Sequence, residues 1–113
     1  MLDGAEYAAL RHSAFFVHAG VYADYPLSDQ PEYVLHWEKF RNPPPHVLGK
    51  VMVCGHTSQK SGLPFDIGHA ICIDTWVYGE GWLTCLEVSR GLLWQANQAG
   101  ELRQLWLDEL LTG

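Results

Sequence analysis

The sequence has few positive charges, and none of them are clustered. Its 113 residues contain 7 Lys and Arg against 13 Asp and Glu, which gives a formal net charge of -6 at pH 7. Nonspecific binding of nucleic acid depends on groups of Lys and Arg that neutralise phosphates. The composition therefore argues against nucleic acid as a partner.

The chain also lacks a long apolar run. No segment approaches the roughly 20 consecutive apolar residues that a membrane-spanning helix needs. The first residues, Met-Leu-Asp-Gly-Ala-Glu, have neither the basic region nor the apolar stretch of a signal peptide. We therefore expect a cytoplasmic protein with no membrane partner, and the length and 48% hydrophobic content fit one domain with a modest core.

Cysteine is scarce and is not arranged for cross-linking. Cys54, Cys72 and Cys85 are odd in number, and none has the Cys-x-x-Cys spacing typical of zinc sites. Each lies within an apolar, strand-like run. We therefore expect all three to be small buried hydrophobic residues.

Two histidines follow apolar runs of the kind that form strands. His18 follows Ala-Phe-Phe-Val and precedes Ala-Gly, and His56 lies in Gly-His-Thr after Val-Met-Val-Cys. A strand that ends at such a turn presents its last side chains at the carboxyl edge of a sheet, where open sheets bind their ligands. Both are candidate metal ligands, although two imidazoles fill only part of a coordination sphere and supply no bridging carboxylate.

The remaining pattern predicts an α+β fold. Residues 6–11 and 32–40 have helical character, and the second segment ends before three prolines at 43–45. The expected strands are short and separated by turns; they cover residues 14–17, 49–54, 70–73, 82–89, 92–97 and 101–107. Residues 101–111 also fit a helical stripe, so that segment is ambiguous. We expect mostly one mixed or antiparallel sheet, with a meander after residue 69 in which Arg90-Gly91 and Ala99-Gly100 form tight hairpin turns.

Five short motifs follow one another between about residues 15 and 86. They are His18-Ala19-Gly20, Cys54-Gly55-His56-Thr57, Ile73-Asp74-Thr75, Tyr78-Gly79-Glu80-Gly81 and Leu83-Thr84. This series resembles the carboxy-terminal half of the bacterial phosphoprotein phosphatases of serine/threonine type, which belong to the calcineurin-like metallophosphoesterases. The resemblance implies that residues 1–113 form a partial metallophosphoesterase domain, equivalent to half of an αββα sandwich.

The resemblance also implies a chemistry. In that family a two-metal centre lies between two sheets, and the histidines that match His18 and His56 both bind the second metal. Manganese is the first expectation for the two divalent ions, with iron and zinc as alternatives. Paired ions activate a water and neutralise phosphoryl oxygens during in-line attack. The implied activity is hydrolysis of phosphomonoesters, with phosphoserine and phosphothreonine in proteins as the first substrates and small phosphomonoesters as the second.

The sequence departs from the family pattern in two places. The motifs G-D-x-H-G, G-D-x-x-D-R-G and G-N-H-E, which supply the first metal site, the bridging aspartate and the proton donor, do not occur. The chain alone is therefore expected to be incomplete and inactive. Lys39 lies two residues beyond Trp37, where many bacterial members have an arginine, so Lys39, or Arg41 if the helix is shifted, is the candidate phosphate-binding residue.

Two further residues are candidates through the resemblance. It implies that Asp74 lies near the metals and helps to position the histidine turns. Asp and Thr also end strands by bonding their own backbone, and this interpretation of Asp74 has equal weight. Tyr78 is a candidate for reaching the phosphate, although an aromatic residue at a strand end more often packs.

Other histidines and the tryptophans match no motif. We expect His12, His36, His46 and His69 to be surface or hydrogen-bonded core residues, and the five tryptophans to pack in the core or on sheet faces. The alternative to an enzyme is a non-catalytic remnant or interaction module, which pairs with itself or with another chain. A separate amino-terminal half that restores activity in trans, and a metal-binding protein without hydrolysis, are the remaining hypotheses.

Overall fold

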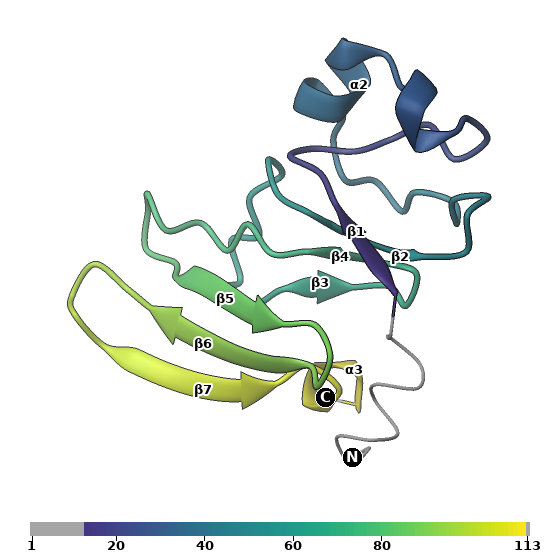
Figure 1. Ribbon diagram of the computed structural model, residues 1–113. Helices are drawn as coiled ribbons and strands as arrows, with labels where there is room; N and C mark the ends of the chain where they lie inside the picture. The colour runs from purple at the N-terminus through teal and green to yellow at the C-terminus, as the bar shows by residue number, and fades with distance from the viewer. Residues whose placement is uncertain (1–12, 113) are drawn as a thin grey trace.

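The computed structural model describes residues 13–112, which form two β-sheets and a few short helices (Figure 1). In chain order the elements are β1 (Ala14–Phe16), the 3-10 helix η1 (Leu27–Asp29), α2 (Glu32–Trp37), β2 (Val51–Cys54), β3 (Phe65–Asp66), β4 (Ala70–Cys72), β5 (Leu83–Glu87), β6 (Leu92–Ala96), β7 (Leu102–Trp106) and α3 (Glu109–Thr112). The predicted α+β class is confirmed. The helix expected over residues 6–11 lies outside the described residues.

The first sheet is mostly parallel, with the order β1-β2-β4-β3. β2 pairs in parallel with β1 on one side and with β4 on the other, and only the two-residue β3 runs antiparallel. The segment between β1 and β2 contains α2 and supplies the crossover that parallel strands require. Every residue of β2 and β4 is buried, which explains why both strands are uninterrupted apolar runs.

Side chains of this sheet alternate between two apolar clusters, as the pleat of a strand requires. One cluster contains Phe15, Phe40, Met52, Cys54, Ala70 and Cys72. On the opposite face, Val51 and Ile71 meet Leu93 of β6 and Leu107, which follows β7. The second cluster is therefore the layer in which the two sheets pack together.

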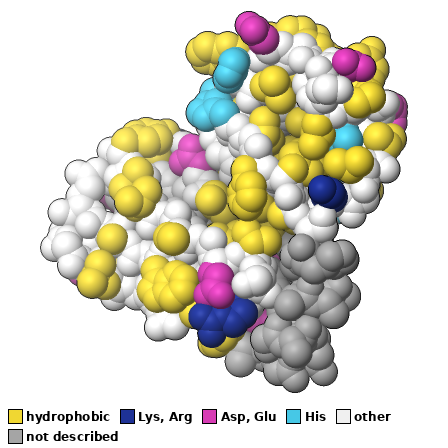
Figure 2. Space-filling model, in the orientation of Figure 1, with side chains coloured by type: hydrophobic (Ala, Val, Ile, Leu, Met, Phe, Trp, Pro, Cys, Tyr) yellow, Lys and Arg dark blue, Asp and Glu magenta, His cyan; other side chains and the backbone are white. Residues whose placement is uncertain are grey.

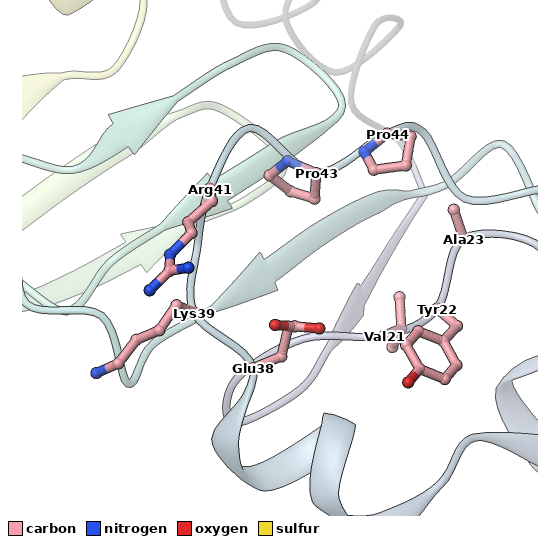
Figure 3. Close-up of a pocket in the computed structure, with 8 residues that line it drawn as sticks. All are labelled: Val21, Tyr22, Ala23, Glu38, Lys39, Arg41, Pro43 and Pro44. Carbon is pink, nitrogen blue, oxygen red and sulfur yellow. The ribbon is translucent and has the colours of Figure 1, made fainter.

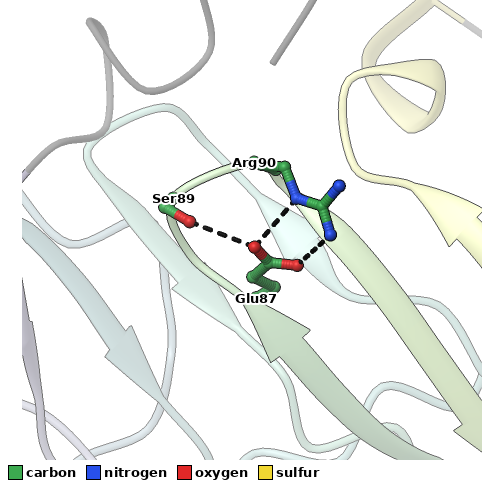
Figure 4. Close-up of polar contacts among 3 residues, drawn as sticks. All are labelled: Glu87, Ser89 and Arg90. Atoms are coloured by element: carbon green, nitrogen blue, oxygen red, sulfur yellow. Dashed lines mark hydrogen bonds and ion pairs between the residues drawn. The ribbon is translucent and has the colours of Figure 1, made fainter. Parts of the chain in front are cut away.

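The second sheet is an antiparallel meander, β5-β6-β7. Its two turns end at Gly91 and Gly100, both with positive φ (71° and 82°), as the sequence predicts for these hairpins. Arg90 donates to both carboxylate oxygens of Glu87 across the first turn, at 2.8 and 2.7 Å (Figure 4). This exposed pair lowers the pKa of Glu87, chiefly through the hydrogen bonds from Arg90.

A buried polar network ties the loop before β3 to the second sheet. Gln95, which is 2% exposed, donates to the carbonyl of Gly62 at 2.9 Å and accepts from Arg103 at 2.6 Å. The Arg103 guanidinium also lies 3.9 Å from the ring centre of Trp82, and burial lowers its pKa. Gly62 has φ of 78°, and a Cβ there would stand 2.9 Å from the Trp82 ring. A side chain at position 62 would therefore disturb this network.

The expectation of mostly one sheet is wrong. Strand β4 joins β2 in the parallel sheet, and β5–β7 form a sheet of their own, because β4 is apolar on both faces whereas β5–β7 bury only one. The ambiguous segment 101–111 begins as strand β7 and turns into α3 only at Glu109. β3 lies inside the predicted loop 58–68, and so short a strand leaves no periodic signal.

Three smaller expectations also differ from the structure. α2 ends at Trp37 rather than at residue 40, because the backbone N–H of Phe40 bonds to the Thr57 hydroxyl at 2.8 Å and the Phe40 ring enters the core. Cys85 is exposed, since its strand position faces outward opposite Trp94. Trp37 is 70% exposed and lies in neither the core nor a sheet, whereas Trp94 lies on the outward face of β6, one of the two places expected for the tryptophans.

Candidate functional site

Three side chains reach the same edge of the parallel sheet. His18, His56 and Asp74 each stand two residues beyond the last residue of a strand, namely β1, β2 and β4. These strands are parallel neighbours, so their carboxyl ends meet at one edge. The prediction that each histidine follows the carboxyl end of a strand is confirmed, and the parallel pairing adds that the two share one edge.

Backbone hydrogen bonds hold the turns after these strands together. The Gly55 N–H donates to the His18 carbonyl at 2.8 Å, and the Gln59 N–H donates to the Asp74 carbonyl at 2.7 Å. A Cβ at position 55 would lie 3.5 Å from the His18 carbonyl and 3.8 Å from the Asp74 Cβ, which shows how closely the three turns approach. His56 itself has φ of 67°, a conformation that non-glycine residues seldom adopt.

The two histidine rings face a common groove. Their centres are 5.1 Å apart, and the ring planes are inclined at 55°. Two imidazoles that share one tetrahedral ion have ring centres about 5 Å apart, given metal–nitrogen distances of about 2.0–2.1 Å. The groove beside them has a volume of about 420 Å³, and Asp74, Thr75 and Tyr78 also line it. The spacing of the two rings therefore matches that of two ligands of one transition-metal ion.

Asp74 and Tyr78 line this groove, and each makes a hydrogen bond within the protein. The Asp74 carboxylate accepts from the Trp76 N–H at 3.3 Å, the local bond expected of a residue that ends a strand. The Tyr78 hydroxyl lies 2.9 Å from the Ser58 hydroxyl, and the side chain is 72% exposed. Thr75 is buried behind them and bonds to the Trp82 carbonyl.

The described residues supply two imidazoles at this edge and little else for a metal. Within residues 13–112, no three His, Cys, Asp or Glu side chains stand in position to hold an ion. Asp74 is the one carboxylate among them that lines the groove, and it accepts a hydrogen bond from the Trp76 N–H. Further ligands for one ion or for two would therefore have to come from outside the described residues.

Lys39 lies in a different hollow from the histidines. Lys39 and Arg41 line a depression of about 260 Å³ together with Tyr22, Glu38 and four apolar residues, as Figure 3 shows. The segment leaves α2 at Trp37, whose ring packs edge-on against His56 at 5.8 Å. Trp37 thus borders the histidine pair, whereas the structure does not bring Lys39 or Arg41 into the histidine groove.

Two buried thiols pack against the turn that contains His56. Cys54 and Cys72 face each other in register on β2 and β4, and the Cys72 Sγ donates to the Thr57 carbonyl at 3.2 Å. The hydrogen bond between the thiols, together with burial, raises the pKa of Cys54. The Cys72 Sγ thus bonds to the carbonyls of Gly55 and Thr57, the residues on either side of His56. The apolar sequence around the cysteines does not predict this contact.

The structure adds a third histidine that the motifs did not indicate. His36, in the last turn of α2, has its ring centre 6.5 Å from that of His18. Histidine side chains lie next to one another near α2 in Figure 2. In the sequence only the adjacency of His36 to Trp37 hints at this position, because contact with His18 depends on how α2 folds back.

The comparisons with known proteins give no family. No protein-family model matches the chain, and neither the curated proteins nor the solved structures contain a match. A membrane-crossing helix is not found in the part of the chain that the structure describes. The functional interpretation therefore depends on the motifs and on the geometry of the groove.

Proposed function

We propose that this chain is the carboxy-terminal part of a metal-dependent phosphomonoesterase that acts on phosphoserine and phosphothreonine in proteins. The observation that carries the proposal is the arrival of His18, His56 and Asp74 at one sheet edge, with the two imidazoles 5.1 Å apart. These are the residues to which the motif resemblance assigns the second metal and its support. Divalent ions would supply charge neutralisation and an activated water in the completed site.

The chain's own residues would contribute binding and positioning. His18 and His56 would hold one ion from the parallel sheet, and Asp74 would fix the neighbouring turn through its bond to the Trp76 N–H. Tyr78 lines the groove and is exposed, so its hydroxyl, which contacts the Ser58 hydroxyl, would be able to meet a phosphorylated side chain. Activity would still require an amino-terminal segment with the three missing motifs.

The test is to join such an amino-terminal segment to this chain and to measure manganese-dependent release of phosphate from a phosphoserine peptide. We expect hydrolysis that is lost in His18→Gln and His56→Asn, where asparagine is chosen because it tolerates positive φ. His69→Gln is the matched control, since His69 bonds to the Pro43 carbonyl at the opposite end of β4. A folded fusion that binds manganese but releases no phosphate would refute the proposal.

An interaction module is the second candidate, and the outward face of β5–β7 favours it. Leu83 and Leu102 are 61% and 81% exposed there beside Trp94, and Figure 2 shows hydrophobic side chains gathered over this sheet. Exposed apolar faces of this kind often mark protein contacts. Sedimentation over a range of concentrations tests self-association. We expect the wild-type chain to associate and Leu102→Lys, which places a charge on this face, to stay monomeric. A wild-type chain that is also monomeric at every concentration would count against an interaction through this face. Activity that appears only on mixing with a separate amino-terminal polypeptide would instead support complementation.

A further inference from the structure

We propose that the hollow beside the end of α2 binds an acidic side chain of a peptide, a carboxylate or a phosphate, at Lys39 and Arg41. This hollow and the groove of His18 and His56 have no lining residue in common. The proposal therefore depends neither on a metal ion nor on the proposed function. Lysine and arginine bind oxyanions through charge-assisted hydrogen bonds, and arginine can form two such bonds in parallel.

Lys39 and Arg41 project from the same side of the segment that follows α2, as Figure 3 shows. Phe40, which lies between them in the chain, is held in the opposite direction. Its N–H donates to the Thr57 hydroxyl at 2.8 Å, and its ring is buried in the core. Both cations are exposed and line the same hollow. An acidic group would therefore bind at the rim that these two side chains form.

The two cations have no opposite charge near them to neutralise. Among residues 13–112, Arg90 forms an ion pair, and Lys60 and Arg103 each lie over a tryptophan ring. Lys39 and Arg41 have neither kind of partner within that part of the chain. The formal net charge of -6 repels an acidic peptide from the molecule as a whole. A peptide of this kind therefore needs a local positive site, and this hollow offers one.

The other walls of the hollow suit a peptide better than a bare ion. Its volume is about 260 Å³, and the walls opposite the cations are Val21, Tyr22, Ala23, Pro43 and Pro44. Since water occupies about 30 Å³ per molecule in the liquid, this space equals about nine waters and has room for more than one acidic group. The Tyr22 N–H donates to the Gln30 side chain and the Pro43 carbonyl bonds to the His69 ring, both at 2.6 Å. Walls that are already fixed reduce the entropy cost of binding.

The test is an NMR titration of the full 113-residue chain with a tri-glutamate peptide blocked at both ends. We expect the amide signals of Lys39 and Arg41 to shift and those of His18 and His56 to stay in place. A blocked tri-lysine peptide should shift none of them. Lys39→Gln and Arg41→Gln should each weaken binding roughly threefold, as for an exposed ion pair, and the double variant about tenfold. Lys50→Gln is the matched control, because it removes the same charge at an exposed position outside the hollow.

Glu38 provides a test in the opposite direction. Its carboxylate lies between the cations and Tyr22 in Figure 3, so it repels an anion at the rim. Glu38→Gln should therefore strengthen binding of the tri-glutamate peptide roughly threefold. A blocked peptide with a single phosphoserine distinguishes the two oxyanions. Tighter binding than tri-glutamate at the same signals would assign a phosphate to the site, and weaker binding would assign a carboxylate.

Three results would overturn the proposal. These are that neither acidic peptide binds, that Lys50→Gln weakens binding as much as Lys39→Gln, or that inorganic phosphate binds as tightly as the peptides. The last result would show that the apolar walls contribute nothing. His18→Gln should abolish the proposed hydrolysis in the fusion and leave peptide binding unchanged. Failure of the hollow and failure of the proposed function are therefore observed separately.

Discussion

Truncation of Leu93 should reveal how much the contact between the two sheets stabilises the fold. Leu93 is fully buried on β6 and packs with Val51 and Ile71 of the parallel sheet and with Leu107. Leu93→Ala removes three carbon atoms, worth about 0.8 kcal/mol each, and leaves a cavity that the surrounding strands fill only partly. Buried Leu→Ala changes cost about 2.7–5.0 kcal/mol, and we expect about 3–4 kcal/mol here.

The assay is urea unfolding monitored by tryptophan fluorescence. The free energies of unfolding of the variant and the wild type are compared at a common m-value. Leu102→Ala is the matched control, because it makes the same change on the same sheet but on the outward face, where Leu102 is 81% exposed. It should change the free energy by no more than about 0.5 kcal/mol. If Leu93→Ala costs no more than the control, the two sheets do not pack through Leu93 and the layer described above is wrong.

Two further predictions concern the thiols and the β5–β6 turn. In the native protein Cys85 should react promptly with a thiol reagent such as Ellman's reagent, whereas Cys54 and Cys72 should react only after unfolding; three equally fast thiols would contradict their burial. Arg90→Met should raise the pKa of Glu87 toward its usual value in an NMR titration while barely moving the urea midpoint, because the pair is exposed. Since the pair lowers that pKa, its small stabilising effect is present above the usual Glu range and disappears as pH falls through the lowered value; an unchanged pKa would show that the ion pair does not form in solution.

Local sequence signals predict the strands and the edge where the histidines emerge. The uninterrupted apolar runs before His18 and His56 predict the two strands, and β2 is buried on both faces as such a run indicates. Phe16 of β1 is exposed, and the parallel pairing of β1 with β2 was not predicted. The glycines at positions 91 and 100 predict the two hairpin turns because only residues that tolerate positive φ suit them. These features depend on neighbours within a few residues, so a single sequence contains them.

Contacts between distant segments are what the sequence does not reveal. Phe40 does not continue the predicted helix because its backbone N–H donates to the Thr57 hydroxyl. No local pattern near residue 40 predicts a hydrogen-bond partner at residue 57. The apolar neighbours of Cys85 predict a buried residue, yet its register opposite Trp94 places it on the outward face of β5–β7. His36 likewise lies near His18 in a part of the fold where the Ala19 N–H bonds to the Leu35 carbonyl, a contact that no local signal predicts. Each of these outcomes is decided by tertiary contacts rather than by local preference.

The connectivity of the parallel sheet determines how the groove could be completed. β1, β2 and β4 each deliver one polar side chain to the same edge, and β1 has no strand neighbour on its far side among residues 13–112. Another segment could supply a further parallel strand that pairs with β1. The residue after the carboxyl end of that strand would then lie beside His18, as His56 does on the other side. His36 instead approaches His18 from α2, which lies outside the sheet (Figure 1). A strand added at the β1 edge would therefore extend the row of post-strand side chains that already contains His18, His56 and Asp74.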